Sequence, residues 1–278
     1  MRSVPAKIVT DTVARMAIDA NYVLDEYFVR AVTSAMERES SPTGREVLAQ
    51  ILRNAEIAGQ GTFPLCQDTG LAVLFVELGE EVHVEGGLRA ALTEGVRKGY
   101  ADGALRKAVC DPFTRANTGD NTPCVIHVDI VPGDRLTVDL LAKGGGSENM
   151  SRAAVLAPGA GEEGVVEYAV ETVRAGAVNA CPPLVVGIGI GGDLELAATI
   201  AKKALTRPLG RASEDARLAR LEERALGEIN KLGIGPAGLG GNTTALAVHA
   251  AAAPCHIASL PVGVVLECHS HRHRRIVL

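Results

Sequence analysis

Large aromatic side chains are scarce in this sequence, which has no Trp and only four Phe and four Tyr among its 278 residues. The core must therefore be built from aliphatic side chains, which the hydrophobic content of 47% supplies. No apolar run reaches the length of about 18 residues that crosses a bilayer, and the N-terminus lacks the apolar core of a signal peptide. These absences argue against a membrane or secreted protein, so we expect a globular protein of the cytoplasm.

Basic clusters are also missing until the last residues, and the net charge is −5. Because neutralising phosphates requires clustered Lys and Arg, this distribution argues against a nucleic-acid partner. An anionic substrate would need a local cationic pocket. Linker-like Ser or Pro runs and repeats of fixed period are absent as well, which favours a single domain over residues 1–278.

The cysteines lack a CxxC pattern that would identify a metal site. In a cytoplasmic chain of this size they are expected to be thiols or metal ligands rather than disulfides. Any one of them, taken alone, is most often a small buried hydrophobic residue. The six are Cys66, Cys110, Cys124, Cys181, Cys255 and Cys268.

Apolar spacing predicts an α+β fold, with a helical N-terminal section followed by mixed β-sheets flanked by helices and glycine-rich loops. Helical spacing covers residues 11–58, 88–98, 164–175, 194–205 and 212–231. Apolar, β-rich runs cover residues 71–78, 125–130, 135–142 and 262–266. We expect Gly99 to end its helix, and the strands 125–130 and 135–142 to pair across a turn at 132–134.

Three segments are rich in glycine, which lets a backbone approach a ligand closely. Residues 144–147 (GGGS) follow a predicted strand, and Ser147 can cap a helix after them. Residues 187–192 have the GxGxxG pattern of dinucleotide-binding proteins, but we predict no second parallel strand to carry a ribose-binding acid. We therefore favour helix packing for this pattern, with a nicotinamide site as the alternative. The third segment, 233–244, suits a backbone wrapped around a ligand.

Two polar segments complete the sequence. Residues 103–123 form a long, turn-rich loop with several cations, and loops of this length in compact proteins tend to be functional. Residues 269–275 contain three His and three Arg, which would suit a metal-binding tract or a solvated basic tail. Because no carboxylates are interleaved with them, we favour the solvated tail.

Several of these motifs resemble one enzyme family. Residues 64–70 (PLCQDTG), 142–147 (AKGGGS), 238–245 (GLGGNTTA) and Cys268 with its trailing His and Arg are similar to the class I fumarase and L-tartrate dehydratase iron–sulfur hydro-lyases. The resemblance follows chain order over nearly the whole sequence, and the CQDTG and GGGS motifs are specific. It implies an enzyme that reversibly dehydrates a 2-hydroxy dicarboxylate.

The resemblance also implies a cofactor. In this family three cysteines bind a [4Fe–4S] cluster, and the matching positions here are Cys66, Cys181 and Cys268. Thiolates are the soft donors that such clusters need, and an iron without a protein ligand can act as a Lewis acid. The other three cysteines match no ligand motif, and we assign them to packing.

Substrate-site residues follow from the same resemblance. Gln67 and Asp68 are expected to reach the substrate, and His256, twelve residues before Cys268, to pair with Asp68 as an acid relay. Arg106 is expected to bind a carboxylate through its guanidinium. Further backbone N–H donors are expected from Gly144, Gly145, Gly146 and Ser147.

Single-chain family members carry a second, β-type domain that contributes further arginines, a lysine and a threonine assigned as the base. This chain ends ten residues after Cys268 (278 − 268), so we expect an α subunit whose β subunit is a separate chain, in an αβ or α2β2 assembly. We favour malate and fumarate as substrates, with L-tartrate as the alternative. An NAD-dependent oxidoreductase, a structural zinc module and a non-catalytic scaffold subunit are the more distant alternatives.

Overall fold

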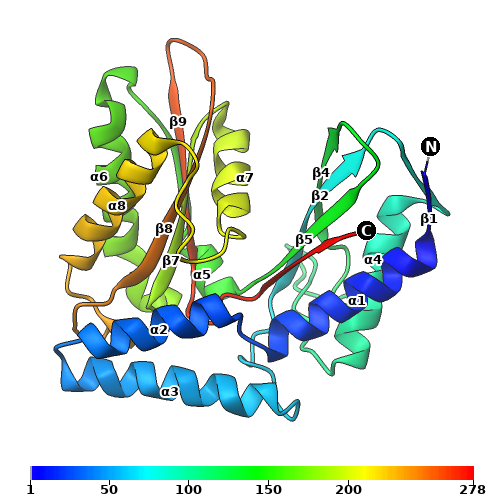
Figure 1. Ribbon diagram of the computed structural model, residues 1–278, viewed down its shortest axis with the longest axis horizontal. Coiled ribbons are helices and arrows are strands. Elements are labelled where there is room, and N and C mark those ends of the chain that lie inside the picture. Colours follow the sequence, from blue (N-terminus) through cyan, green and yellow to red (C-terminus); the bar gives the residue numbers. More distant parts are fainter. Residues whose placement is uncertain (1) are drawn as a thin grey trace. The chain divides into compact units, whose positions relative to one another are not determined.

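The computed structural model describes residues 2–278 and confirms the mixed α+β fold (Figure 1). The chain forms two compact units, each with its own hydrophobic core. Unit 1 comprises the chain up to Leu24, Ala55–Gly145 and Arg272–Leu278; unit 2 comprises Asp25–Asn54 and Gly146–His271. Two junctions fall inside helices, so no linker composition marks them. The expectation of one catalytic domain over residues 1–278 stays a prediction.

Unit 1 is built on a four-stranded sheet with the strand order β10-β5-β2-β4. A two-stranded parallel sheet joins β1 and β3, and helices α1 and α4 pack together and share one core with the larger sheet. The elements are β1 (Arg2–Pro5), α1 (Ala6–Tyr22), β2 (Leu71–Gly79), β3 (Val82–Glu85), α4 (Leu88–Asp102), β4 (Val125–Val131), β5 (Leu136–Lys143) and β10 (His273–Val277).

Gly99 does not end α4, contrary to the sequence-based expectation. The helix continues to Asp102, and Gly103 follows it. A Cβ atom at Gly99 would lie 2.6 Å from the carbonyl oxygen of Ala14 in α1. The glycine therefore allows the two helices to approach each other closely, a role that its position alone does not distinguish from helix termination.

The predicted pairing of the strands at 125–130 and 135–142 is wrong. Both strands exist as β4 and β5, but β2 lies between them, parallel to β4 and antiparallel to β5. The turn residue Gly133 instead accepts a hydrogen bond from Glu81 N at 3.0 Å, next to the end of β2. Local turn chemistry predicted the reversal of the chain correctly but contained no information about the strand inserted between its arms.

Unit 2 is built on a second four-stranded sheet, with the order β6-β9-β7-β8. Helix α7 packs on one face, and α6 and α8 cover the other (Figure 1). The elements are α2 (Glu26–Arg38), α3 (Pro42–Gly59, whose end belongs to unit 1), α5 (Gly145–Asn149), β6 (Arg152–Leu156), α6 (Gly161–Gly176), β7 (Leu184–Gly191), α7 (Leu194–Ala204), α8 (Ala216–Asn230), β8 (Ala245–Ala253) and β9 (Leu260–Glu267).

The GxGxxG pattern is used for packing between β7 and α7. A Cβ atom at Gly187 would lie 2.1 Å from the carbonyl oxygen of Ala201, and one at Gly189 would lie 2.0 Å from that of Ala197. The N-terminus of α7 is capped by the chain's own Asp193, whose Oδ1 accepts from Leu196 N at 2.8 Å. One premise of the sequence argument was wrong, because β8 does run parallel to β7.

The C-terminal His and Arg residues do not form a solvated tail. They lead into β10, which begins at His273 and pairs antiparallel with β5 at one edge of the unit 1 sheet. Arg272 is 1% exposed, and His271 and His273 are also buried. The composition favoured a solvated segment, but strand pairing and buried hydrogen bonds override composition here. None of the helices within residues 2–278 combines the length and apolar character needed to cross a membrane.

Candidate active site

The turn at residues 66–70 belongs to unit 1, and backbone N–H groups hold its carboxylate. Oδ1 of Asp68 accepts a hydrogen bond from Gly70 N at 3.0 Å, and Oδ2 accepts one from Gly145 N at 2.8 Å. Gly144 lies beside the same oxygen, since a Cβ atom there would be 3.5 Å from Oδ2. The structure thus brings Asp68 together with two of the glycines singled out in the sequence.

Gln67 and Arg106 lie at the exposed edge of this turn. Nη1 of Arg106 donates to Oε1 of Gln67 at 2.7 Å, and the Thr69 hydroxyl donates to the Arg106 carbonyl at 2.9 Å. Both the Gln67 and the Arg106 side chains are exposed. A guanidinium has five N–H donors, so an arginine with one such contact can still bind a carboxylate with two parallel hydrogen bonds.

Two buried side chains that the sequence analysis missed form hydrogen bonds with backbone carbonyl groups of this turn. The Tyr100 hydroxyl lies 2.8 Å from the Thr69 carbonyl oxygen and 3.0 Å from that of Gly70. Burial raises the pKa of Tyr100, which keeps the hydroxyl protonated as a donor. Asn121 Nδ2 also donates to the Gly70 carbonyl, at 3.2 Å. Neither residue belongs to a motif, and only the long polar loop around Asn121 gave a signal.

Arg272 is the third missed residue. Its guanidinium is buried and donates to the Asp68 carbonyl oxygen and, at 3.3 Å, to Asn21 Oδ1. The carbonyl is the backbone acceptor of the residue whose side chain is held by Gly70 and Gly145. Arg272 therefore fixes the backbone of Asp68 while those two glycines fix its side chain.

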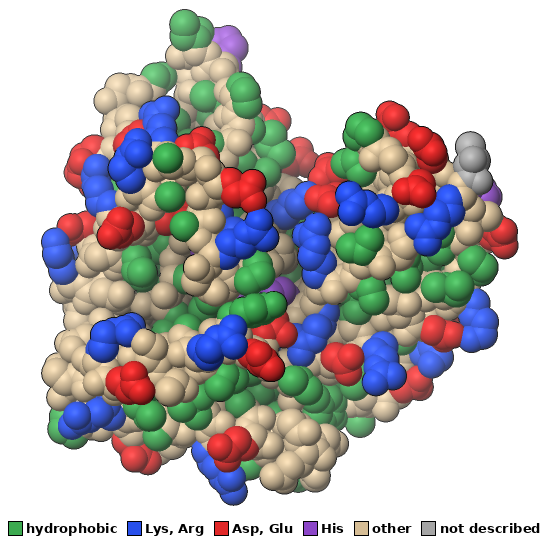
Figure 2. Space-filling view, viewed as in Figure 1, with side chains coloured by type: hydrophobic (Ala, Val, Ile, Leu, Met, Phe, Trp, Pro, Cys, Tyr) green, Lys and Arg blue, Asp and Glu red, His purple; other side chains and the backbone are tan. Residues whose placement is uncertain are grey.

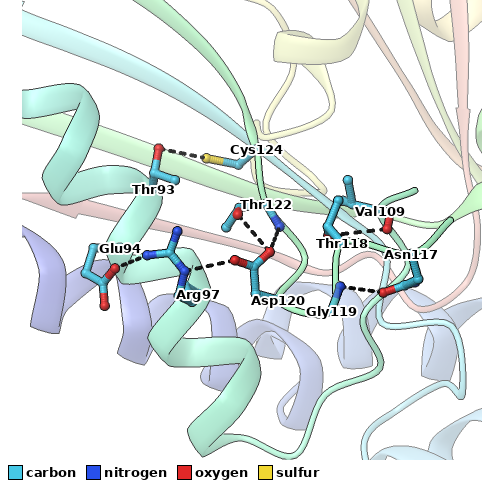
Figure 3. Close-up of polar contacts among 10 residues, drawn as sticks. All are labelled: Thr93, Glu94, Arg97, Val109, Asn117, Thr118, Gly119, Asp120, Thr122 and Cys124. Atoms are coloured by element: carbon cyan, nitrogen blue, oxygen red, sulfur yellow. Dashed lines mark hydrogen bonds and ion pairs between the residues drawn. The ribbon is translucent and has the colours of Figure 1, made fainter. Parts of the chain in front are cut away.

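The loop that precedes β4 is held by its own polar side chains and by Arg97 of α4 (Figure 3). Asp120 accepts hydrogen bonds from Arg97 Nε at 2.9 Å and from Thr122 N at 2.9 Å. These contacts, chiefly the one with Arg97, lower the pKa of Asp120 to about 2. Asn121 Oδ1 accepts from Ala108 N at 2.7 Å. The loop is therefore an ordered support for the turn at residues 66–70.

In unit 2 the structure brings Cys181 and Cys268 together. His269, the residue after Cys268, donates its backbone N–H to the Cys181 carbonyl at 3.2 Å, and its Nδ1 lies 3.1 Å from the same oxygen. Cys181 has φ +56° and ψ +69°, a left-handed conformation that residues other than glycine rarely adopt. Strained positions of this kind cluster at functional sites.

A pocket of about 360 Å³ opens beside Cys181 in unit 2. One wall comes from α3, and the others come from the segments around Pro182, Ala237 and His269. The GGGS motif also reaches this region, since a Cβ atom at Gly146 would lie 3.2 Å from the Asn179 carbonyl oxygen. Ser147 is buried within α5 rather than acting as a cap before a helix.

His256 lies far from Cys268 within unit 2. It sits in the loop between β8 and β9, beyond the carboxyl end of β7, whereas Cys181 and Cys268 lie at the amino end of β7. The eight residues of β9 separate His256 from Cys268, which corresponds to about 26 Å of extended strand. This loop exposes His and hydrophobic side chains (Figure 2), with Ile257 92% exposed.

The other cysteines have different surroundings. Cys124 is buried, and burial raises the pKa of its thiol, in agreement with a packing role. Cys255 is exposed and donates from Sγ to the Ser259 carbonyl, and Cys110 is half-buried. The packing assignment therefore holds for Cys124 and is wrong for Cys255.

The family model for fumarate hydratase (Fumerase) matches residues 10–277 of this chain. The chain belongs to the fumarate hydratase (Fumerase) family. Relatives of this Fumerase-family chain include a Methanocaldococcus jannaschii protein, provisionally named as an L(+)-tartrate dehydratase subunit alpha, which is 38% identical and matches over 95% of each chain. The L(+)-tartrate dehydratase subunit alpha of Escherichia coli UTI89 is 35% identical over 95% of this chain and 88% of its own length. The subunit of the same name from Escherichia coli K12 is 33% identical, and the match covers 97% of this chain and 90% of that protein's own length.

Membership of the fumarate hydratase family makes this chain part of a hydro-lyase, a carbon–oxygen lyase. Within residues 2–278, no group of three or more His, Cys, Asp or Glu side chains is arranged to hold a metal ion. Of the three cysteines expected as cluster ligands, Cys66 belongs to unit 1, and Cys181 and Cys268 belong to unit 2. The structure thus pairs two of the expected ligands and separately gathers Gln67, Asp68, Arg106, Gly144 and Gly145.

Proposed function

We propose that this chain is the α subunit of a hydro-lyase that removes water from a 2-hydroxy dicarboxylate, with L-tartrate as its substrate. The observation that carries the proposal is the match to proteins named L(+)-tartrate dehydratase subunit alpha along almost their whole length. Malate, which the sequence analysis favoured, becomes the second candidate. The family description, fumarate hydratase, supports it, whereas the names of the relatives described above do not.

We further propose a [4Fe–4S] cluster held by Cys66, Cys181 and Cys268. The donor set fits, because all three thiols are at least partly exposed and none forms a disulfide. Thiolate sulfur is the donor that iron–sulfur clusters require. When bound, the cluster would supply an open iron that acts as a Lewis acid toward the substrate hydroxyl.

In this proposal the residues of the 66–70 turn bind and orient the substrate. The Arg106 guanidinium pairs with a substrate carboxylate, and Gln67, which Arg106 already contacts, donates from its amide to the same region. Asp68 is the proton carrier, held in place by Gly70 and Gly145. Gly146 and Ser147 stay proposed backbone donors.

His256 stays a proposed partner of Asp68, with one condition. Because β9 separates His256 from Cys268, the His256 of a given chain would not reach a cluster bound to Cys268 of that same chain. The histidine would have to come from a second copy of the chain. The exposed loop around Ile257, between β8 and β9, suits such a contact.

The proposed partner is a β subunit, in an αβ or α2β2 assembly. The "subunit alpha" in the names of the relatives supports it, and the general base is expected on that partner. We also propose a cytoplasmic location. The six cysteines are all free thiols, as is usual in a reducing compartment.

Cysteine substitution tests the cofactor. After anaerobic reconstitution, the wild-type chain should be brown, with about four irons per chain as expected for this cluster type. Cys66→Ser, Cys181→Ser and Cys268→Ser should each lose the visible absorbance. Cys255→Ser, which removes an exposed thiol, should retain it. A colourless wild-type protein with stoichiometric zinc would instead favour a structural metal module.

A further inference from the structure

Glu39 is a carboxylate with only 2% exposure, located in unit 2 directly after α2. Its oxygens accept backbone N–H groups from a segment 203 residues later in the chain. Asn242 N lies 2.9 Å from Oε1 and 3.0 Å from Oε2, and Thr243 N lies 3.0 Å from Oε2. Ser41 N adds a contact of 3.0 Å to Oε1. Both carboxylate oxygens are therefore used to hold backbone.

The ionised form of Glu39 is the one that these contacts stabilise. Burial by itself would raise its pKa, but the hydrogen bonds from Asn242, Ser41 and Thr243 outweigh burial and lower the pKa. Glu39 therefore stays charged at neutral pH. Gly241 is also needed, because a Cβ atom there would lie 2.8 Å from Glu39 Oε1. The glycine-rich segment thus wraps around a side chain of its own chain.

The segment anchored by Glu39 continues to the pocket beside Cys181. Gly235 N donates to the Thr244 hydroxyl at 3.2 Å, which closes the segment on itself. Ala237 N then donates to the Pro182 carbonyl at 2.8 Å, and Ala237 and Pro182 both line the pocket. The opposite wall belongs to α3, the helix that begins three residues after Glu39. Glu39 therefore ties two walls of this pocket together.

We propose that Glu39 is a positioning residue for Cys181: it fixes the segment 235–243, and this segment fixes the backbone at Pro182 through Ala237. The role of Cys181 as a cluster ligand rests on the proposed function. The contacts themselves do not.

Unit 2 offers a matched control. Glu222 is also a buried carboxylate that holds backbone, since it accepts from Ala250 N at 2.7 Å and from Ser213 N at 3.1 Å. It lies on α8 and does not line the pocket. Glu222 also forms an ion pair with Arg207. Glu222→Gln therefore removes a charge contact as well as weakening the hold on the backbone, and it perturbs the fold of unit 2 without loosening the segment 235–243.

The test compares the wild-type chain with Glu39→Ala, Glu39→Gln and Glu222→Gln, all full-length and cluster-free. Amide hydrogen exchange is measured at Asn242 and Ala237, and the rate of alkylation of Cys181 by iodoacetamide is measured against that of Cys255. We expect Glu39→Ala to speed exchange at both amides at least tenfold and alkylation at least threefold. Glu39→Gln, which keeps one acceptor oxygen, should show smaller changes in the same direction. Glu222→Gln should stay within twofold of wild type.

Faster exchange at Asn242 with no change at Ala237 or Cys181 would overturn the proposal, because Glu39 would then be only a local anchor. Should Glu39→Ala fail to fold, Glu39→Gln decides by the same readouts. A second measurement uses the reconstituted protein, in which Glu39→Gln should lose its visible absorbance in air faster than Glu222→Gln does. If the wild-type chain takes up no iron at all, the proposed cofactor fails, while exchange and alkylation still decide the role of Glu39.

Discussion

Asp120 shows how a single carboxylate stabilises the loop beneath the candidate site. It pairs with Arg97 and accepts two hydrogen bonds from Thr122 (Figure 3). We expect Asp120→Asn to lower the free energy of unfolding of unit 1 by about 1 kcal/mol at pH 7. The value is modest because 32% of the Asp120 side chain and 43% of the Arg97 side chain are exposed to solvent. Hydrogen exchange at the core amides of β2, measured as a function of urea, would give this free energy.

The effect of Asp120→Asn should depend on pH in a defined direction. The pKa of Asp120 is lowered to about 2 in the folded protein, against about 3.9 in an unfolded chain. The stabilisation is therefore complete above about pH 4 and is lost as the pH falls from about 4 toward about 2. Glu80→Gln, which changes an exposed acid of the same unit, is the control. A wild-type advantage that stayed constant down to pH 2 would contradict the role of the charge.

At the residue scale, the sequence predicted the members of the 66–70 turn better than their supports. Motif resemblance pointed to Gln67, Asp68 and Arg106, and the structure brings them to one turn. Tyr100 and Arg272 were missed because their contacts with this turn join residues about 30 and about 200 positions apart. Local patterns carry no information on partners at such separations.

At the element scale, the glycines of β7 can be tested directly. We expect Gly187→Ala to destabilise unit 2 by about 3 kcal/mol or more, because the added methyl group would lie 2.1 Å from the Ala201 carbonyl oxygen in α7. Helix and strand would have to separate to accommodate it. Urea-dependent hydrogen exchange at the amides of β9 would measure the loss.

Gly227→Ala in α8 is the matched control. Nothing lies within 4 Å of a Cβ atom at that position, so alanine should stabilise the helix by about 0.5–1 kcal/mol. A Gly187→Ala protein as stable as wild type would contradict the packing role. If the same protein also lost binding of a nicotinamide nucleotide, the dinucleotide interpretation of the GxGxxG pattern would replace it.

Element type was predicted well, and element partners were not. The helical character of the N-terminal section, the strand after the CQDTG turn and the strand–helix pair around the GxGxxG pattern follow from periodicity, because periodicity reports which face of a segment is buried. The division of that section into α1, α2 and α3 was not predicted. The order of the strands in each sheet, by contrast, does not follow from periodicity. The insertion of β2 between β4 and β5 and the addition of β10 at the sheet edge are long-range pairings, and these are decided by packing of the whole unit.

At the scale of the whole molecule, unit 1 is assembled from three separate parts of the chain, including both ends. Arg272, near the C-terminus, supports Asp68, which lies 204 positions earlier in the sequence. The family match extends over residues 10–277, so it includes the parts that build both units. The residues of the candidate site and its supports are therefore spread along the sequence from Asn21 to Arg272.

The proposed partner makes a prediction about the whole enzyme. A cluster-loaded α chain alone should turn over L-tartrate at a rate at least about 100-fold lower than that of the reconstituted pair with its β subunit, because loss of a general base typically costs about 10²–10⁴ in rate.

Anaerobic assays of the pair with L-tartrate, malate and mesaconate side by side should rank L-tartrate first, as the names of the relatives suggest. Asp68→Asn in the pair should lower kcat strongly, whereas an unchanged kcat would indicate a non-catalytic scaffold subunit. Full activity of the isolated chain would contradict the need for a partner, and a preference for malate would restore the first substrate prediction without changing the proposed roles of Arg106 and Asp68.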